Sequence, residues 1–248
     1  MEVNGYDLRP RGYLAGAKLP KVDLQGLILE AIYIPDADLR GANLRGTEFY
    51  WAYAMRTNFA RADLTEADLR EAHLTDSNFR GADLTGAKLH GATAFRADFR
   101  GANLTDAVMC WANLTGANLT GANLCGADLY QSNFAGAILT NANLTGANIL
   151  EANFTGANFC GANLAGAIQF SPGDNSFDGV ELMFADLNGA ILTEIDLSNS
   201  NLSFANLSDA DFSRANLVGA TLNRRAGQHF SSDANFSGAI MPDGTIHD

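Results

Sequence analysis

Four histidines and three cysteines are among the side chains of this 248-residue chain best suited to bind a metal or to act as nucleophiles. Metal sites usually bring such residues together at short spacings, as in Cys-x-x-Cys or two histidines on one turn of helix. The residues of this kind lie scattered along the chain: His73, His90, His229, His247, Cys110, Cys125 and Cys160. We therefore expect no metal site and no cofactor, and we expect the cysteines to be free thiols in a reducing cytoplasm.

Acidic residues are abundant, with 28 Asp and Glu, but they give no catalytic signature. Many of them occupy one fixed position of a short repeat, so pairs of carboxylates arise without a role in acid–base chemistry. The glycine-rich segment GADLTGAKLHG, residues 81–91, lacks the Lys-Ser/Thr pair of a phosphate-binding loop. With no nucleophile, base or metal set in a recognisable arrangement, we predict that the chain is not an enzyme.

A repeat of five residues must position all of these side chains. Ala, then Asn or Asp, then Leu or Phe recurs from Leu14 to Gln169, which makes 32 consecutive units without an insertion. We call the large apolar residue the centre of its unit; among these units only Ala54, Ala94 and Gln169 replace Leu, Ile, Phe or Met at the centre. A period of five fits neither an amphipathic helix nor an alternating strand.

This pattern resembles the pentapeptide repeat family, whose unit is A-[D/N]-[L/F]-x-x, over about nine-tenths of the chain. The resemblance implies an all-β fold, a right-handed quadrilateral parallel β-helix in which four units form one square coil. The centre and the small residue two positions before it would point inward. Every fourth centre from Leu24 to Leu164 is Leu, which agrees with a coil of four units. We expect about ten to eleven coils, interrupted by one or two loops.

Two breaks in the repeat divide the chain into predicted segments. Phe170–Gly179 (FSPGDNSFDG) and Asn223–Asp233 (NRRAGQHFSSD) are rich in loop-forming residues. The predicted order is an N-terminal cap (1–13), a first β-helix block (14–169), a loop (170–179), a second block (180–222), a second loop (223–233), and the last repeats with the C-terminal tail (234–248).

Aromatic side chains gather at outward positions of one edge when the coils are stacked by sequence count. Tyr13, Tyr33, Tyr53 and His73 precede the centre on one face, and both tryptophans occupy equivalent positions in coils that lie three apart. Tyr and Trp at a clustered surface often anchor a protein partner, although isolated exposed aromatics need no explanation. The candidate partner-binding residues are Tyr33, Tyr50, Trp51, Tyr53, Trp111 and Tyr130.

A second outward column is basic. Arg40, Arg80 and Arg100 follow the centre on a different face, with Arg61 beside them. This charged ladder could bind a partner, but it alternates with acids, which favours a solvated charge network. The acids concerned are Asp38, Asp63, Asp83 and Asp98.

Two function hypotheses follow. The C-terminal tail SGAIMPDGTIHD resembles cyanobacterial members of the family, which implies a non-catalytic protein-binding scaffold or regulatory interaction protein. The alternative is another branch of the family, DNA-mimicking proteins that bind DNA gyrase and protect it from quinolones. The net charge of −12 suits that branch, and residues 101–213 contain 11 acids and no Lys or Arg. The first hundred residues weaken it, because they hold 13 Lys and Arg against 14 acids.

The partner expected under either hypothesis is a protein. We expect no direct binding of nucleic acid, because the overall charge is negative. No run of about 18 apolar residues is present, so we expect no membrane helix and a cytoplasmic location.

Overall fold

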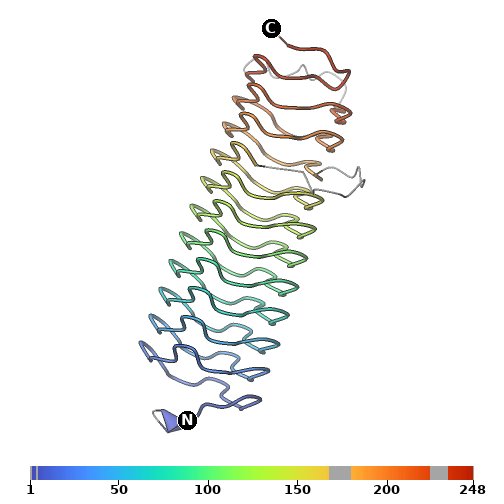
Figure 1. Cartoon of the computed structure of the whole chain (residues 1–248). Helices are drawn as coiled ribbons and strands as arrows, with labels where there is room; N and C mark the ends of the chain where they lie inside the picture. The colour runs from blue at the N-terminus through green and yellow to red at the C-terminus, as the bar shows by residue number, and fades with distance from the viewer. Residues whose placement is uncertain (1, 4, 168–179, 224–233, 248) are drawn as a thin grey trace.

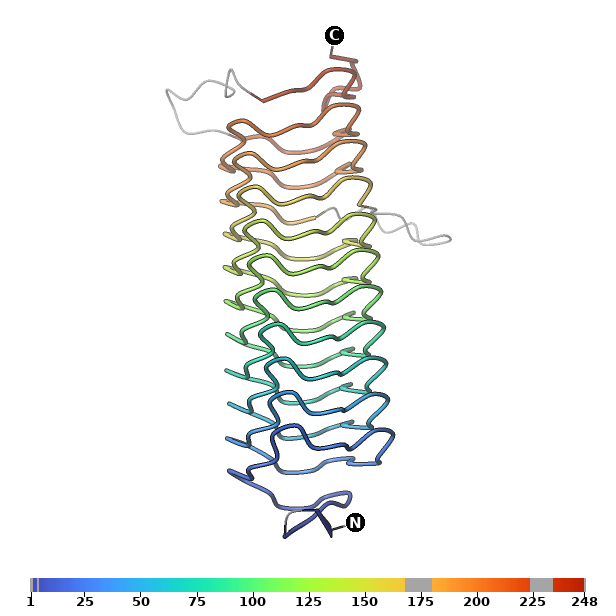
Figure 2. The ribbon, with the colours of Figure 1, turned by 90° about the vertical axis from the view of Figure 1, so that its left-hand side faces the viewer.

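The computed structural model describes residues 2–3, 5–167, 180–223 and 234–247. The chain winds as a right-handed quadrilateral β-helix whose coils stack into a long rod (Figure 1, Figure 2). Through most of the rod, residues separated by four repeat units, such as Asp83 and Asn103, form parallel bridges between successive coils, as the sequence period predicts. One face contains eleven bridged residues from Tyr13 to Thr221, which confirms the predicted ten to eleven coils.

Each five-residue unit consists of a short extended piece and a tight turn. In the unit centred on Leu104, the amides of Asn103 and Leu104 donate to carbonyl oxygens of the preceding and following coils, at 2.9 and 2.6 Å. The amide of Ala107 donates to the carbonyl of Leu104 at 3.1 Å and closes the turn. The third residue of this turn, Asp106, has φ of +55°. A positive φ at that place is the requirement of a type II turn, and glycine meets it with least strain.

The core is a continuous column of apolar side chains inside the rod. The centres and the small residues two positions before them are buried almost throughout, as expected. The rings of Phe59, Phe79 and Phe99 stack with centroids 4.8 Å apart, which matches the spacing of neighbouring strands. Ala54 and Ala94 are also buried, while the large residues that follow them, Met55 and Phe95, lie half-exposed at the outward position.

Polar residues at the small inward position are satisfied by the backbone. Thr57 Oγ1 donates to the carbonyl of Ile34 at 2.7 Å, and Ser77 Oγ donates to the carbonyl of Ala54 at 2.6 Å. In the described part of the chain no buried side-chain nitrogen or oxygen lacks a hydrogen-bond partner. Buried hydroxyl groups therefore do not weaken the core.

Both ends of the described rod carry antiparallel pairing that differs from the coils. Strand β1 (Glu2–Val3) pairs with strand β2 (Tyr6–Asp7) at the N-terminal end. At the C-terminal end, Ile240 pairs antiparallel with Ile246. Such local hairpins cover the first and last coils, which have no neighbouring coil on one side.

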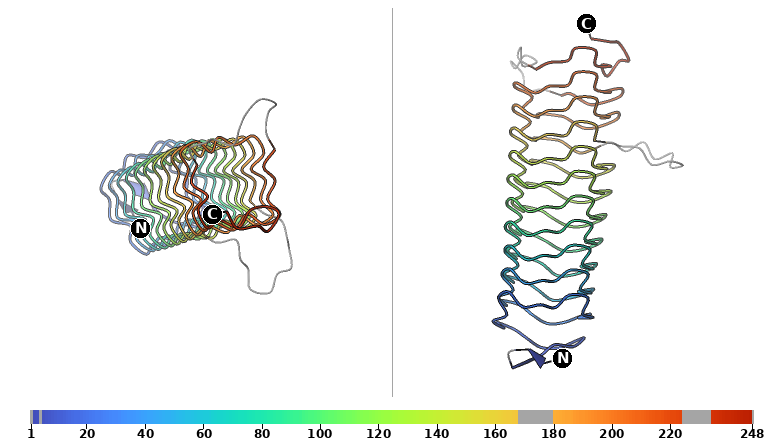
Figure 3. Two further views of the ribbon diagram at one scale, coloured as in Figure 1. Left: turned by 90° about the horizontal axis from the view of Figure 1, so that it is seen from above. Right: turned by 60° about the vertical axis from the view of Figure 1, so that its left-hand side comes forward.

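The bridges also set the phase of the coils beyond the first block. Asn153 pairs with Glu181, and Asp211 pairs with Asn235, so both separations exceed the four units of a regular coil. Leu182 therefore continues the face that begins at Leu14, and the coils of both blocks lie in one stack (Figure 3). The predicted loops, apart from Asn223, and the centre Gln169 lie outside the described residues.

Within the described ranges, no helix is long and apolar enough to cross a bilayer. The same ranges contain no group of three or more His, Cys, Asp or Glu side chains placed to hold a metal ion.

Candidate functional site

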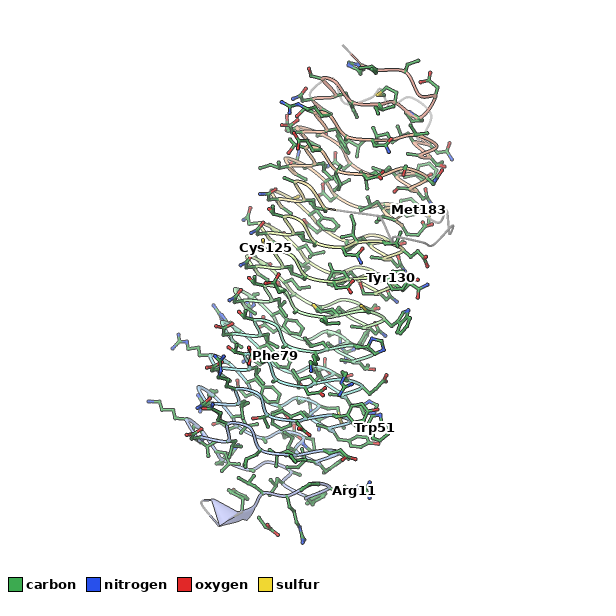
Figure 4. All side chains as sticks on the ribbon, in the orientation of Figure 1. Arg11, Trp51, Phe79, Cys125, Tyr130 and Met183 are labelled. Carbon is green, nitrogen blue, oxygen red and sulfur yellow. The ribbon has the colours of Figure 1, made fainter. Side chains whose placement is uncertain are left out.

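One corner of the rod carries the aromatic side chains singled out in the sequence, and we call it the aromatic edge. It is the corner between the face that contains Phe49 and the face that contains Tyr13. Each coil places three outward residues at this corner: the two that follow one centre, such as Tyr50 and Trp51, and the one that precedes the next centre, such as Tyr53. Trp51 and Tyr130 project from the same side of the rod, whereas Phe79 lies inside it (Figure 4). The members are Tyr13, Tyr33, Tyr50, Trp51, Tyr53, His73, His90, Trp111 and Tyr130.

The aromatic residues of the edge form two clusters. The lower cluster, nearer the N-terminus, is a ladder of stacked rings. Tyr13 stacks on Tyr33 with ring centroids 4.8 Å apart, and Tyr53 stacks on His73 at 4.7 Å. Around the corner, Tyr50 stacks on Trp51 at 4.3 Å. These contacts hold the rings in fixed positions, so little conformational entropy remains to be lost when a partner binds.

The upper cluster, nearer the C-terminus, consists of His90, Trp111 and Tyr130. The ring of His90 meets the indole edge-on with centroids 4.6 Å apart, and Tyr130 lies 6.1 Å away. The indole Nε1 donates a hydrogen bond to Gln131 Oε1, and Gln131 Nε2 in turn donates to Glu151 at 2.5 Å. A hydrogen-bond chain therefore orients this tryptophan.

Polar residues separate the two clusters, so the edge is not a continuous apolar strip. The guanidinium of Arg70 lies over the Tyr50 ring, 5.2 Å from its centroid, and also binds Asp68 at 2.5 Å. The carboxylate of Glu71 lies over Gly91. The edge thus offers two aromatic clusters with a charged stretch between them.

Both tryptophans occupy the left-handed backbone conformation that the turn imposes at every corner. Trp51 has φ of +56° and Trp111 has φ of +57°, and their side chains are 48% and 53% exposed. Glycine occupies the equivalent turn position in about half of the corners of the rod. A bulky residue in the left-handed region costs roughly 1–2 kcal/mol, and half-exposed rings recover only part of it by burial.

The predicted charged ladder is only partly neutralised. Arg40 and Arg100 each form two hydrogen bonds with the aspartate two residues earlier, at 2.5–2.8 Å. These bonds hold the pKa of the Asp38 and Asp98 carboxyl groups below the usual range. Arg80 has no such partner, because its preceding outward residue is Asn78. An arginine–aspartate pair of the expected solvated network therefore forms at Arg40 and at Arg100 but not at Arg80.

The sequence reasoning missed a third exposed aromatic group. Phe184 and Phe204 stack at 5.3 Å, are 50% and 39% exposed, and both have positive φ. They follow the centre by two residues on the face of Leu14, away from the aromatic edge. Counting along the second block puts these two residues one coil apart in a single outward column, but the place of that column relative to the aromatic edge is set only by the bridges across the break.

Two of the three thiols, Cys110 and Cys160, are held in an unreactive form. Burial, together with a hydrogen bond to Asp128, raises the pKa of the Cys110 thiol to about 12. Burial and Asp186 likewise raise the pKa of Cys160. Both thiols therefore stay protonated at neutral pH, and a protonated thiol is a poor nucleophile.

We expect the folded protein at pH 8 to react rapidly with one equivalent of DTNB, at Cys125, and slowly with two more, at Cys110 and Cys160. Unfolding in urea should make all three thiols react quickly, because the pKa values of Cys110 and Cys160 then return to the normal range. The C125A variant provides the control and should lack the rapid phase; a rapid phase that persists in it would contradict the assignment.

Comparison with known proteins places this architecture in a family. The family model for pentapeptide repeats matches eight copies, over residues 33–60, 62–94, 95–131, 127–166 and 181–219. HetL, a pentapeptide repeat protein involved in heterocyst differentiation regulation in the cyanobacterium Nostoc sp. strain PCC 7120, is 32% identical; the similarity covers 96% of this chain and 94% of HetL, with a TM-score of 0.33.

Two further solved structures illustrate the range of similar proteins. A trypsin-treated form of QnrB1, a plasmid-mediated fluoroquinolone resistance protein, is 25% identical over 86% of this chain and 90% of its own, with a TM-score of 0.40. The pentapeptide repeat protein Rfr23 from the cyanobacterium Cyanothece 51142 is 27% identical over 54% and 85%, with a TM-score of 0.31. No curated protein matches the chain. The matches to the repeat model span more than half of the residues, and the bridges reproduce its coil of four units, so the chain belongs to the pentapeptide repeat family.

Proposed function

We propose that this protein is a non-catalytic scaffold that binds another protein through the aromatic edge. The observation that carries the proposal is the placement of Trp51 and Trp111, the two tryptophans of the chain, on the same corner at equivalent positions with positive φ. The turn imposes this φ on whatever residue occupies the corner, so what distinguishes the two tryptophans is that large aromatic rings stand half-exposed at aligned positions of one edge.

The chemistry of the edge suits a protein partner. Trp and Tyr provide large, rigid contact areas and are enriched at the centres of interfaces. The charged stretch of Arg70 and Glu71 between the clusters provides polar contacts that fix the orientation of a partner. A peptide or domain that spans both clusters would contact four coils of the rod, from Trp51 to Trp111, over about 15 Å at the sheet spacing.

A regulatory role in a cyanobacterial cell is the finer form of this proposal. The gyrase-binding alternative has less support, because DNA mimicry needs a continuous negative surface. The first five coils instead carry a column of cations at one corner, among them Arg40, Arg80 and Arg100. The aromatic edge has no role in such mimicry, whereas it accounts directly for a protein contact.

The test is affinity capture from the native cell extract with the wild-type protein and the variant W51G/W111G. Glycine occupies about half of the equivalent turn positions, including Gly91 on this edge, and tolerates the positive φ, so we expect this variant to fold with a stability within about 1 kcal/mol of wild type. Proteins that depend on the aromatic edge should be lost from the captured fraction and should not return when the salt concentration is lowered.

The matched control is F184G/F204G, which removes two stacked, exposed aromatic residues from positive-φ corners on another edge. It should retain the partner that W51G/W111G loses. Equal capture by wild type and both variants would remove the aromatic edge as the binding surface.

A further inference from the structure

A basic hollow runs along the corner diagonally opposite the aromatic edge. This corner follows the units centred on Leu19, Leu39 and Phe59, two faces away from the units of Trp51 and Trp111. The hollow is open to solvent, has a volume of ≈ 820 Å³ and spans five consecutive coils. Each coil contributes one cation: Lys21, Arg40, Arg61, Arg80 and Arg100.

Among the described residues, three of these cations form no ion pair, although Arg80 lies close enough to Asp98 to help lower the pKa of that carboxyl group. Arg40 and Arg100 bind the aspartate of their own unit, whereas Lys21, Arg61 and Arg80 form no ion pair among the described residues. Outside the hollow, seven ion pairs neutralise all the described cations except Lys18 and Lys88. Unpaired positive charge is therefore concentrated in this hollow, although the protein as a whole has a net charge of −12.

The neighbouring corner shows how the same fold neutralises such a column. There Asp36, Arg56, Asp76 and Arg96 alternate from coil to coil, with guanidinium–carboxylate distances of 2.7 and 2.8 Å. In the hollow, the equivalent column places glycine where the neighbour has aspartate. The side chain of Lys21 lies over Gly41, and that of Arg61 lies over Gly81. The order of the hollow column is Lys21, Gly41, Arg61, Gly81.

Glycine in place of a counterion has two effects. It leaves the cations without a neutralising partner, and it removes the side chains that would fill the space beside them. Arg61 itself has φ of +59°, the conformation in which glycine is favoured. Arg56 and Arg96 of the neutralised column have the same positive φ, so what distinguishes the hollow is a set of cations without an ion-paired carboxylate beside an open space.

We propose that this hollow binds an extended acidic segment of a protein. The five cations span about 20 Å at the sheet spacing, the length of about six residues of extended chain. Carboxylates on alternate residues of such a segment would face Lys21, Arg61 and Arg80 and form charge-assisted hydrogen bonds with them. This surface is separate from the aromatic edge, so the proposal does not depend on the function assigned to that edge.

A nucleic acid fits the hollow less well. Its lining contains no aromatic side chain on which bases could stack. Beyond the fifth coil the chain has no Lys or Arg until residue 214, so a longer polyanion would meet a repulsive surface. A short acidic peptide avoids both problems.

The test is fluorescence anisotropy with a fluorescein-labelled hexaglutamate peptide and the full-length protein in low salt. The variant R61G/R80T copies Gly121 and Thr120, which occupy the same two columns further along the rod, so it should fold normally. We expect it to bind the peptide at least tenfold more weakly than wild type, and we expect wild-type binding to weaken as NaCl is raised.

The control R56G/R96G removes the same amount of charge from the neighbouring column and should change the affinity less than twofold. The W51G/W111G variant should bind the peptide as wild type does, which separates this proposal from the one on the aromatic edge. The proposal is overturned if the peptide does not bind, if both arginine double variants lose affinity equally, or if a six-nucleotide thymidine oligonucleotide binds more tightly than the peptide.

Discussion

Replacing Phe79 with alanine is expected to lower the free energy of unfolding by about 3–5 kcal/mol, the usual cost of removing a buried phenylalanine. The ring of Phe79 is completely buried and stacks on both Phe59 and Phe99, at 4.8 Å with interplanar angles of 6° and 3°. Its removal leaves a cavity in the middle of the column. The strands on either side are held by backbone hydrogen bonds, so the coil cannot collapse to fill that cavity.

Urea unfolding followed by circular dichroism would measure this effect, with F95A as the matched control. Phe95 belongs to the coil that follows that of Phe79, but it lies half-exposed on the outside with Arg96 over its ring at 4.4 Å. Its replacement should cost no more than about 1 kcal/mol, because only a cation–π contact and partial burial are lost. Similar losses in the two variants would show that the Phe stack is not the main packing element of these coils.

Deleting residues 101–105 is expected to abolish partner capture while leaving the rod folded. The five-residue units are nearly equivalent, so the unit after the deletion can take the vacant face, with Asp106 at the corner that Gly101 occupied. Both residues adopt positive φ, at +55° and +62°. Trp111 and Tyr130 then move by one face to the adjacent corner, and the contact between Trp111 and His90 is lost.

This deletion keeps every aromatic residue of the edge and all five cations of the basic hollow. A partner that requires both clusters on one edge should therefore bind at least tenfold more weakly, as measured by capture or titration with the identified partner. Hexaglutamate binding should remain unchanged, because Arg100 precedes the deletion.

The control is deletion of residues 141–145, which shifts everything beyond residue 145 by the same one face but leaves both aromatic clusters aligned. The two deletion variants differ only in the placement of residues 106–140. If both captured the partner equally well, alignment of the two clusters would have no role in binding.

The sequence alone predicted most of the fold and only part of the candidate site. An uninterrupted period of five and a coil of four units determine which residues share a face, because each step along the sequence corresponds to a fixed rotation around the rod. The inward position of Phe79 and the outward position of Trp51 follow from this count, and the structure places both as expected. This count fails where the repeat is interrupted, because a segment without the five-residue period does not show which face the next unit occupies. Only the tertiary structure shows that Asn153 pairs with Glu181.

Only the tertiary structure shows which side chains pair with one another and which residues have a positive φ. The sequence places Arg80 near several acids, but its own unit carries Asn78, and the aspartates around it are bound by other groups: Asp83 by Thr85 and Asp98 by Arg100. The positive φ of Trp51 and Trp111 follows from the turn that closes each unit, which forces the third residue into the left-handed region whatever its type. The repeat thus determined where each side chain lies, whereas hydrogen bonding between coils and within corners determined which charges stay unpaired and which residues are strained.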